Sequence, residues 1–167
     1  MLYELLKRCT SIFFNLFNLL LGGKLPPFGS AGVIVEENDQ YLVVELPGNR
    51  FVFPGGFMTW REDPREAAQR EGHEETGLLL EADDLINYYP CPSSGWTNMS
   101  TVSFIYHARV IGGTLHNNAE GKPCWLPEPE LRTRLTGHSR LILDDYLRYR
   151  TRHKSPSHSP ENLSLVS

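Results

Sequence analysis

Cysteine and excess basic charge are both scarce in this chain of 167 residues, and each absence limits its function. The cysteines are an odd and scattered set without the paired spacing of a zinc site: Cys9, Cys91 and Cys124. We interpret them as free thiols in a reducing compartment and therefore expect a cytoplasmic protein. The net charge of −4 supplies no basic surface for a nucleic-acid polymer, so we expect no such partner.

An uninterrupted apolar run that could cross a bilayer is also missing. The longest run, Ile12 to Leu21, contains Asn15 and Asn18 and is well short of the roughly 20 residues that a spanning helix needs. No small-residue cleavage site of an export signal follows it. The run nevertheless belongs to a strongly apolar segment, residues 1–25, whose pattern needs an explanation of its own.

Residues 1–25 have the three- and four-residue apolar periodicity of an amphipathic helix. Its apolar positions are Leu2, Leu5, Leu6, Cys9, Ile12, Phe13, Leu16, Phe17 and Leu20. Three interpretations remain open: the helix packs onto its own domain or a dimer partner, it lies in a membrane surface, or it is an export signal. We therefore predict an N-terminal helix, which is a candidate for a dimer contact or a peripheral membrane-surface contact.

The rest of the chain divides into a folded domain, residues 26–150, and a polar tail, residues 151–167. Apolar residues make up 40% of the chain and charged residues 22%, which is ordinary for a globular domain with one core. The tail is rich in Ser and Pro and has too few apolar residues to pack, so we predict disorder there. We find no internal repeat that would indicate a solenoid.

Short β-branched runs and helical patterns alternate through the domain. The predicted strands cover residues 32–36, 41–46, 50–53 and 101–110, and the first two form a hairpin. A helix begins after Asp63, with Pro64 in its first position, and ends at Gly77. Further helical patterns cover residues 128–135 and 139–150. This order predicts an α/β fold with a mixed β-sheet between helices.

The helix that ends at Gly77 carries a cluster of carboxylates. Glu71, Glu74 and Glu75 lie three and four residues apart and therefore share one helix face. Like charges at that spacing destabilise a bare helix by about 0.2–0.5 kcal/mol per pair, and the C-terminal end of a helix favours cations instead. A hard divalent cation such as Mg²⁺ would relieve the repulsion. A solvated acidic helix face is the alternative interpretation.

Two glycines before this helix favour the metal interpretation. Gly55 and Gly56 follow a predicted strand, where a backbone without side chains can approach a ligand closely or offer a carbonyl to a metal. A strand, a Gly-rich loop and a helix with clustered carboxylates together form an arrangement suited to phosphate and metal binding.

The segment from Gly56 to Leu78, GFMTWREDPREAAQREGHEETGL, resembles the Nudix box, G-x5-E-x7-R-E-U-x-E-E-x-G-U, in which U is a bulky aliphatic residue. All seven fixed positions match: Gly56, Glu62, Arg70, Glu71, Glu74, Glu75 and Gly77. Gly72 stands where an aliphatic residue is usual. We expect this departure to cost the helix about 1 kcal/mol relative to Ala and to remove a core contact.

The resemblance implies a Nudix-type α/β/α sandwich and a role for each matched acid. Glu71, Glu74 and Glu75 resemble the carboxylates that hold Mg²⁺, or Mn²⁺ in its place, and the carbonyl of Gly56 is a further expected ligand. Glu62 would be an outer-shell acid or a ligand of a second metal ion.

The resemblance also implies catalytic residues. In some family members the residue that matches Glu71 is the proposed general base, and Arg70 would orient it; an ion pair with Glu74 is the structural alternative for Arg70. Outside the box, Glu120 precedes Trp125 much as an additional catalytic acid does in similar proteins. An exposed loop glutamate is the alternative interpretation of Glu120.

The activity that the resemblance implies is Mg²⁺-dependent hydrolysis of a phosphoanhydride bond in a nucleoside diphosphate linked to a group X. The substrate would be a small-molecule nucleotide derivative: a nucleotide, a nucleotide sugar or a compound of the ADP-ribose type. The segment after the box, with Tyr88 and Pro90, fits no substrate subgroup cleanly, so X stays unassigned. A catalytically silent nucleotide-binding regulatory module of the same fold is the alternative, which the complete set of acids disfavours.

Overall fold

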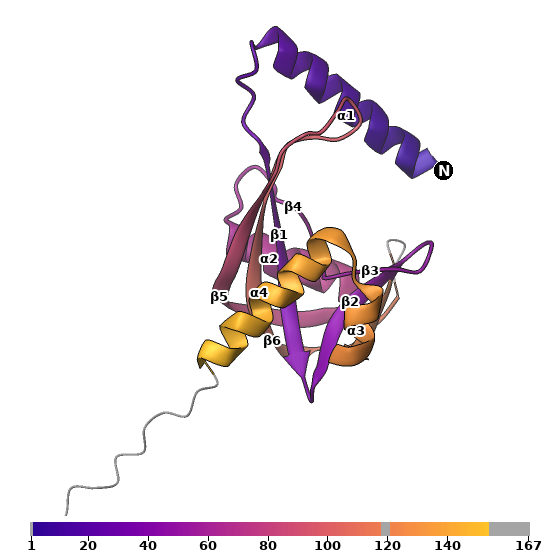
Figure 1. The fold of residues 1–167 in the computed structure, drawn as a ribbon, viewed down its shortest axis with the longest axis vertical. Coiled ribbons are helices and arrows are strands. Elements are labelled where there is room, and N and C mark those ends of the chain that lie inside the picture. Colours follow the sequence, from indigo (N-terminus) through magenta and orange to yellow (C-terminus); the bar gives the residue numbers. More distant parts are fainter. Residues whose placement is uncertain (1, 118–120, 154–167) are drawn as a thin grey trace, which may run out of the picture.

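The computed structural model describes residues 2–117 and 121–153, in which short strands are interleaved with helices (Figure 1). The helices are α1 (Leu2–Leu20), α2 (Pro64–Thr76), α3 (Glu128–Arg134) and α4 (Gly137–His153). The strands are β1 (Phe28–Glu37), β2 (Gln40–Leu46), β3 (Arg50–Val52), β4 (Gly55–Phe57), β5 (Leu78–Cys91), β6 (Thr101–Gly113) and β7 (Lys122–Pro127). The predicted disordered tail therefore begins inside α4, and its residues 154–167 lie outside the described residues.

The strands form a seven-stranded mixed sheet with the order β3-β2-β1-β6-β5. Off this path, β4 pairs with β1 and β7 pairs with β2. β1 and β6 run parallel, whereas the other pairs are antiparallel. β1 lies in the centre of the sheet and pairs with β4, and both strands contact α2. This arrangement places β4 beside the helix that carries the carboxylates.

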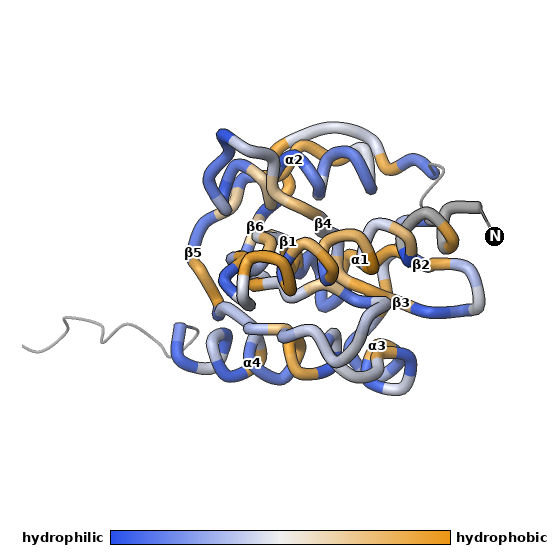
Figure 2. The backbone as a smooth tube through the Cα atoms, turned by 90° about the horizontal axis from the view of Figure 1, so that it is seen from above, coloured by the Kyte–Doolittle hydropathy of each residue, from blue (hydrophilic) through white to orange (hydrophobic). Residues whose placement is uncertain are grey.

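Alternate residues of β1 point to opposite faces of the sheet and build two core layers. Val33 and Val35 belong to the buried cluster that also contains Ala67 of α2. Ile34 belongs instead to the cluster that contains Leu143 of α4. Figure 2 shows α2 on one side of the strands, and α3 and α4 on the other. The predicted α/β/α sandwich with a mixed sheet between helices is therefore confirmed.

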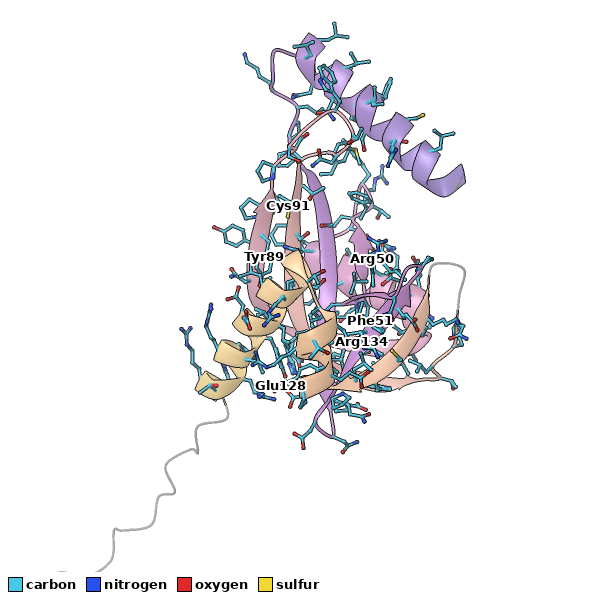
Figure 3. The ribbon with its side chains drawn as sticks, turned by 45° about the vertical axis from the view of Figure 1, so that its right-hand side comes forward. Arg50, Phe51, Tyr89, Cys91, Glu128 and Arg134 are labelled. Atoms are coloured by element: carbon cyan, nitrogen blue, oxygen red, sulfur yellow. The ribbon has the colours of Figure 1, made fainter. Side chains whose placement is uncertain are left out.

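Side-chain contacts hold the layer formed by α3 and α4 against the sheet. The guanidinium of Arg134 in α3 lies 5.0 Å from the ring centre of Phe51 in β3, and both residues are labelled in Figure 3. Arg150 of α4 donates a hydrogen bond of 3.0 Å to the carboxylate of Glu36, which also accepts one of 2.8 Å from the Tyr146 hydroxyl. These contacts tie the C-terminal helices to β1 and β3.

The longest strand, β5, and the shorter β7 were not among the strands that the sequence predicts. β5 pairs with β6 from Leu78 to Cys91, but register shifts interrupt the pairing around Leu80, Leu85 and Asn87. A bulge moves later side chains to the opposite face, so the apolar alternation that identifies a strand is lost. Tertiary pairing with β6, rather than local pattern, therefore defines β5.

The packing around Gly72 corrects one expectation. A β-carbon added to Gly72 would lie 2.6 Å from Cδ1 of Leu80 and 3.3 Å from Cγ2 of Val33. The side chain of Leu80, which comes from β5, therefore occupies the space that an aliphatic residue in α2 would fill. The predicted loss of a core contact is wrong for this reason, because β5 replaces the contact.

The amphipathic helix predicted near the N-terminus is present as α1, which lies at one end of the molecule beside the loop between β5 and β6 (Figure 1). The side of α1 that contacts this loop is polar, with Asn15 hydrogen-bonded to the carbonyls of Trp96 and Asn98. The helix therefore contacts its own domain, as one of the predicted alternatives has it, through Asn15 and through Phe14 against Phe28, whereas most of its apolar residues are exposed. None of the described helices is long and apolar enough to cross a bilayer.

Candidate active site

Two well-formed caps fix the ends of α2 and so place its carboxylates. The Asp63 side chain accepts hydrogen bonds from the backbone N–H groups of Arg65, at 2.8 Å, and Glu66, at 3.0 Å. The Glu66 side chain accepts one in return from the N–H of Asp63 at 3.2 Å, which completes a capping box. Gly77 ends the helix in the left-handed conformation, with a φ of 79°. The predicted start and end of this helix are confirmed.

Arg70 joins the carboxylates of the loop and the helix. Its Nε and Nη2 donate to the two oxygens of Glu62 at 2.7 and 2.9 Å. Its Nη1 donates to Glu71 at 2.8 Å and to Glu74 at 3.0 Å, and Nη2 also donates to the carbonyl of Phe57 at 3.0 Å. Arg70 therefore contacts Glu71 and forms an ion pair with Glu74, so the contacts that both interpretations of Arg70 require are present. The guanidinium also offsets the repulsion among these acids.

The electrostatics of this cluster hold Glu62 ionised. The hydrogen bonds from Arg70 lower the pKa of Glu62 from 4.5 to about 2, against the opposing effect of burial. The same contact with Glu62 raises the pKa of Arg70 above its usual value. Because Glu62 takes two of the guanidinium donors, it acts as the residue that positions Arg70 beside the other acids.

The carboxylate of Glu71 lies directly against the backbone of Gly56. A β-carbon at Gly56 would overlap with the Glu71 carboxylate, whose Oε1 would be 2.7 Å away. Only glycine allows this approach, which brings a helix carboxylate beside the β4 backbone. This observation gives a physical reason for the glycine that begins the box.

Glu75 is the most buried acid of the cluster, with 8% of its surface exposed. One of its oxygens accepts a hydrogen bond of 2.9 Å from the N–H of Gly55. The sequence predicted that the backbone of Gly55 and Gly56 approaches a ligand or offers a carbonyl to a metal, whereas the structure uses the N–H of Gly55 to link β4 to Glu75. The carbonyl of Phe57 was likewise missed, since no side-chain pattern reveals a backbone acceptor.

The structure thus brings together six of the predicted site residues, Gly56, Glu62, Arg70, Glu71, Glu74 and Glu75. Glu120 lies outside the described residues. Within residues 2–117 and 121–153, no group of three or more His, Cys, Asp or Glu side chains is already arranged to hold a metal ion. The donor chemistry fits a hard cation nonetheless, because the cluster offers carboxylate oxygens and Gly56 leaves the β4 backbone open to Glu71.

Comparison with known proteins identifies the family. The family profile described as the NUDIX domain matches residues 26–146, which is most of the chain and includes the whole site. The chain belongs to the Nudix family. It is a Nudix pyrophosphohydrolase that acts on nucleotide derivatives, and enzymes of this family use divalent metal ions.

Two curated proteins similar to this Nudix enzyme differ in their named substrates. An ADP-ribose pyrophosphatase of Methanocaldococcus jannaschii is 26% identical, over 86% of this chain and 98% of that protein. The human 8-oxo-dGDP phosphatase NUDT18 is 30% identical, over 78% of this chain and 42% of that protein. Among solved structures, a NUDIX hydrolase from Nitrosomonas europaea superposes with a TM-score of 0.66 at 21% identity, over 74% of this chain and 90% of that one. This last likeness concerns the fold alone.

Proposed function

We propose that this Nudix enzyme uses Mg²⁺, with Mn²⁺ as a substitute, to hydrolyse the phosphoanhydride bond of a nucleoside diphosphate linked to a group X. The observation that carries the proposal is that two acids of α2 meet the backbone of β4: the Glu71 carboxylate lies against Gly56, and Glu75 accepts a hydrogen bond from the N–H of Gly55. Acidic side chains gathered at this density beside a glycine backbone favour a cation and a phosphate as ligands.

The residues that would hold the metal are Glu71, Glu74 and Glu75, together with the carbonyl of Gly56 and with Glu62 as an outer acid. A bound divalent cation supplies charge neutralisation of the diphosphate and a lower pKa for a bound water. Glu75 already has one oxygen fixed by the N–H of Gly55, so its carboxylate is oriented before any ligand arrives.

The chain's own residues would perform the proton transfer. Arg70 holds one oxygen of Glu71 at 2.8 Å, which leaves the carboxylate in a fixed orientation beside Gly56. A carboxylate held in this way can accept a proton from the attacking water as a general base. Glu62 keeps Arg70 in place through two hydrogen bonds and so acts as a positioning residue. Glu120 stays a candidate additional acid.

The substrate that we propose to test first is ADP-ribose. The Methanocaldococcus relative named for this substrate matches along almost its whole length. The relative named for 8-oxo-dGDP matches over less than half of its own length. With ADP-ribose, addition of one water would break one P–O bond of the anhydride bridge between the two phosphates and yield AMP and ribose 5-phosphate.

We further propose that the enzyme works in a reducing compartment such as the cytoplasm. Its cysteines, Cys9, Cys91 and Cys124, are all free thiols in the structure. Free thiols of this kind persist where thiol reductants prevail.

A substrate panel tests the proposed function. Purified full-length protein would be incubated with ADP-ribose, nucleoside diphosphate sugars, 8-oxo-dGDP and nucleoside triphosphates, with Mg²⁺, with Mn²⁺ or with EDTA, and the products separated by anion exchange. We expect AMP and ribose 5-phosphate from ADP-ribose with either metal and no product with EDTA. Absence of hydrolysis across the whole panel with metal present, or equal turnover in EDTA, would contradict the proposal.

A further inference from the structure

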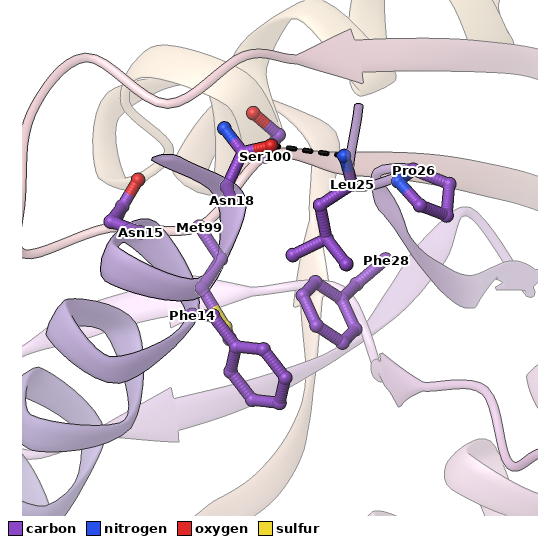
Figure 4. A pocket seen from close by; sticks show the side chains of 8 residues that line it. All are labelled: Phe14, Asn15, Asn18, Leu25, Pro26, Phe28, Met99 and Ser100. Atoms are coloured by element: carbon purple, nitrogen blue, oxygen red, sulfur yellow. Dashed lines mark hydrogen bonds between the residues drawn. The ribbon is translucent and has the colours of Figure 1, made fainter. Parts of the chain in front are cut away.

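The helix α1 is oriented with its polar side toward the domain. The side-chain amide of Asn15 donates hydrogen bonds to the carbonyls of Trp96, at 3.2 Å, and Asn98, at 3.0 Å. The Asn18 side chain accepts one of 3.0 Å from the N–H of Leu25, drawn as a dashed line in Figure 4. Asn15 therefore bonds α1 to the loop between β5 and β6, and Asn18 holds the segment that follows the helix.

Apolar contacts fix the helix on the same side. The rings of Phe14 and Phe28 meet edge to face, with their centres 4.7 Å apart. Both line a cavity of about 30 Å³ beneath the helix, together with Met99 of the loop between β5 and β6 (Figure 4). Ser11 is buried on this side of the helix, with 3% of its surface exposed. The helix therefore has a defined rotation about its own axis.

This rotation turns most of the apolar residues of α1 away from the protein. Phe13 is 61% exposed and Leu20 is 83% exposed. We call the exposed apolar set the outer face of α1: Leu5, Ile12, Phe13, Leu16, Phe17, Leu19 and Leu20. In Figure 2 much of this helix is drawn in the hydrophobic colour, and Figure 3 shows side chains projecting from it beyond the rest of the fold. A continuous exposed apolar patch of this kind marks an interaction surface.

The charge of the same segment differs in sign from that of the whole chain. Residues 1–27 contain Lys7, Arg8 and Lys24 against one acid, Glu4, which gives a net charge of +2. The chain as a whole carries −4, so the remaining residues carry −6. A second copy of the chain would bring the same positive segment, which disfavours pairing through this end. An anionic surface complements it.

We propose that the outer face of α1 docks onto an anionic lipid surface, with the helix lying in the plane of the interface and the Nudix domain on the water side. An interfacial helix buries its apolar face among the acyl chains and keeps its polar face toward water. Here the polar side already holds the domain through Asn15, so insertion of the outer face would not disturb these contacts. Arg8 and Lys24, both exposed, add attraction to acidic headgroups.

Cosedimentation with sucrose-loaded vesicles tests the docking. The full-length protein would be mixed with vesicles of phosphatidylcholine alone, or of phosphatidylcholine with phosphatidylserine, at low and high salt. We expect it to pellet with the phosphatidylserine vesicles, more weakly at high salt. Replacing Arg8 and Lys24 by Gln should weaken binding about fivefold per residue.

Two matched double variants distinguish binding through the outer face from nonspecific binding through any exposed apolar residue. Phe13→Asp with Phe17→Asp should weaken vesicle binding by at least about tenfold. Ile111→Asp with Leu141→Asp, which changes two exposed apolar residues of β6 and α4, should leave it unchanged. Far-ultraviolet circular dichroism and hydrolase turnover on a soluble substrate would confirm that both double variants are folded.

Several results would overturn the proposal. One is a protein that stays in the supernatant with every vesicle composition. Another is a Phe13→Asp and Phe17→Asp variant that pellets as well as the unaltered chain. Light scattering gives the remaining test: a stable dimer that these two substitutions convert to a monomer, without any vesicle binding, would assign the outer face to a second copy instead.

Discussion

Arg70 is the single residue on which the geometry of the candidate site depends most. Its guanidinium donates four hydrogen bonds to the carboxylates of Glu62, Glu71 and Glu74, which requires the planar fork of donors that only arginine has. A lysine offers one point charge and could not hold Glu62 by two bonds while also reaching Glu71. The match of Arg70 to the Nudix box predicted its contact with Glu71. Its two hydrogen bonds to Glu62 were not predicted, because they depend on how the loop before α2 folds back onto the helix.

At the residue scale, His107 gives a pH-dependent prediction. Burial lowers the pKa of His107 below 6.5, although Asp83 opposes this, and its ring stacks on Tyr146. The unfolded chain takes up the proton near pH 6.5, whereas the folded chain takes it up only at lower pH. The free energy of unfolding should therefore fall as pH drops below 6.5, by at most about 1.4 kcal/mol per pH unit for this one proton, and His107 should contribute nothing above that pH.

Urea unfolding at a series of pH values, for the unaltered chain and for His107→Gln, measures this contribution. The free energy of unfolding of the variant should fall less steeply as the pH is lowered below 6.5. An equal slope in the two proteins would mean that the histidine does not titrate differently in the folded state.

Individual residues of the site could be predicted from sequence to the extent that side chains carry the chemistry. Glu71, Glu74 and Glu75 were identified by their spacing on one helix face, and the roles of Glu62 and Arg70 followed from the resemblance to the Nudix box. The N–H of Gly55 and the carbonyl of Phe57 were not identified, because every residue has these groups and only the fold selects which ones are used.

At the scale of elements, α2 and β5 show what local sequence can and cannot predict. The ends of α2 are encoded within a few residues by Asp63, Glu66 and Gly77, so its limits were predicted correctly. β5 is interrupted by bulges, and its pairing with β6 involves residues far along the chain. That non-local pairing is what the sequence pattern alone failed to reveal.

The contact between α2 and β5 at Gly72 gives a prediction at this scale. Gly72→Leu should destabilise the protein by about 1–3 kcal/mol, because the added side chain overlaps with Leu80 and Val33. Combining it with Leu80→Ala should restore part of that stability, since the truncation vacates the same space. Thermal and chemical unfolding of both single variants and the double variant form a complete double-mutant cycle. Strictly additive effects would show that the two side chains do not compete for one site.

At the scale of the whole molecule, the arrangement of the sandwich could be predicted from the sequence, whereas the orientation of the N-terminal helix could not. The order of the elements predicted an α/β fold with a mixed sheet between helices, and the resemblance to the Nudix family implied the α/β/α sandwich. The orientation of α1 was not predicted, because amphipathic periodicity identifies two faces without saying which one meets the domain. The hydrogen bonds of Asn15 decide the matter in favour of the polar face.

The substrate is the other property that element order does not predict. The candidate site is built from α2, β4 and the loop between them, and these residues do not assign group X. Relatives named for ADP-ribose and for 8-oxo-dGDP both share this fold region with the chain. The substrate panel with metal is therefore needed to assign X.

The central claim, that the carboxylates of α2 carry out metal-dependent hydrolysis, is tested most directly by comparing Glu71→Gln with Glu66→Gln. Both change one glutamate of the same helix, but Glu66 belongs to the capping box, where glutamine serves equally well. With the best substrate and Mg²⁺, kcat should fall by about 100-fold or more in Glu71→Gln and stay near the unaltered value in Glu66→Gln. Mg²⁺ should also raise the Tm of the unaltered chain and of Glu66→Gln more than that of Glu71→Gln. A Glu71→Gln enzyme with near-normal kcat would contradict the assignment.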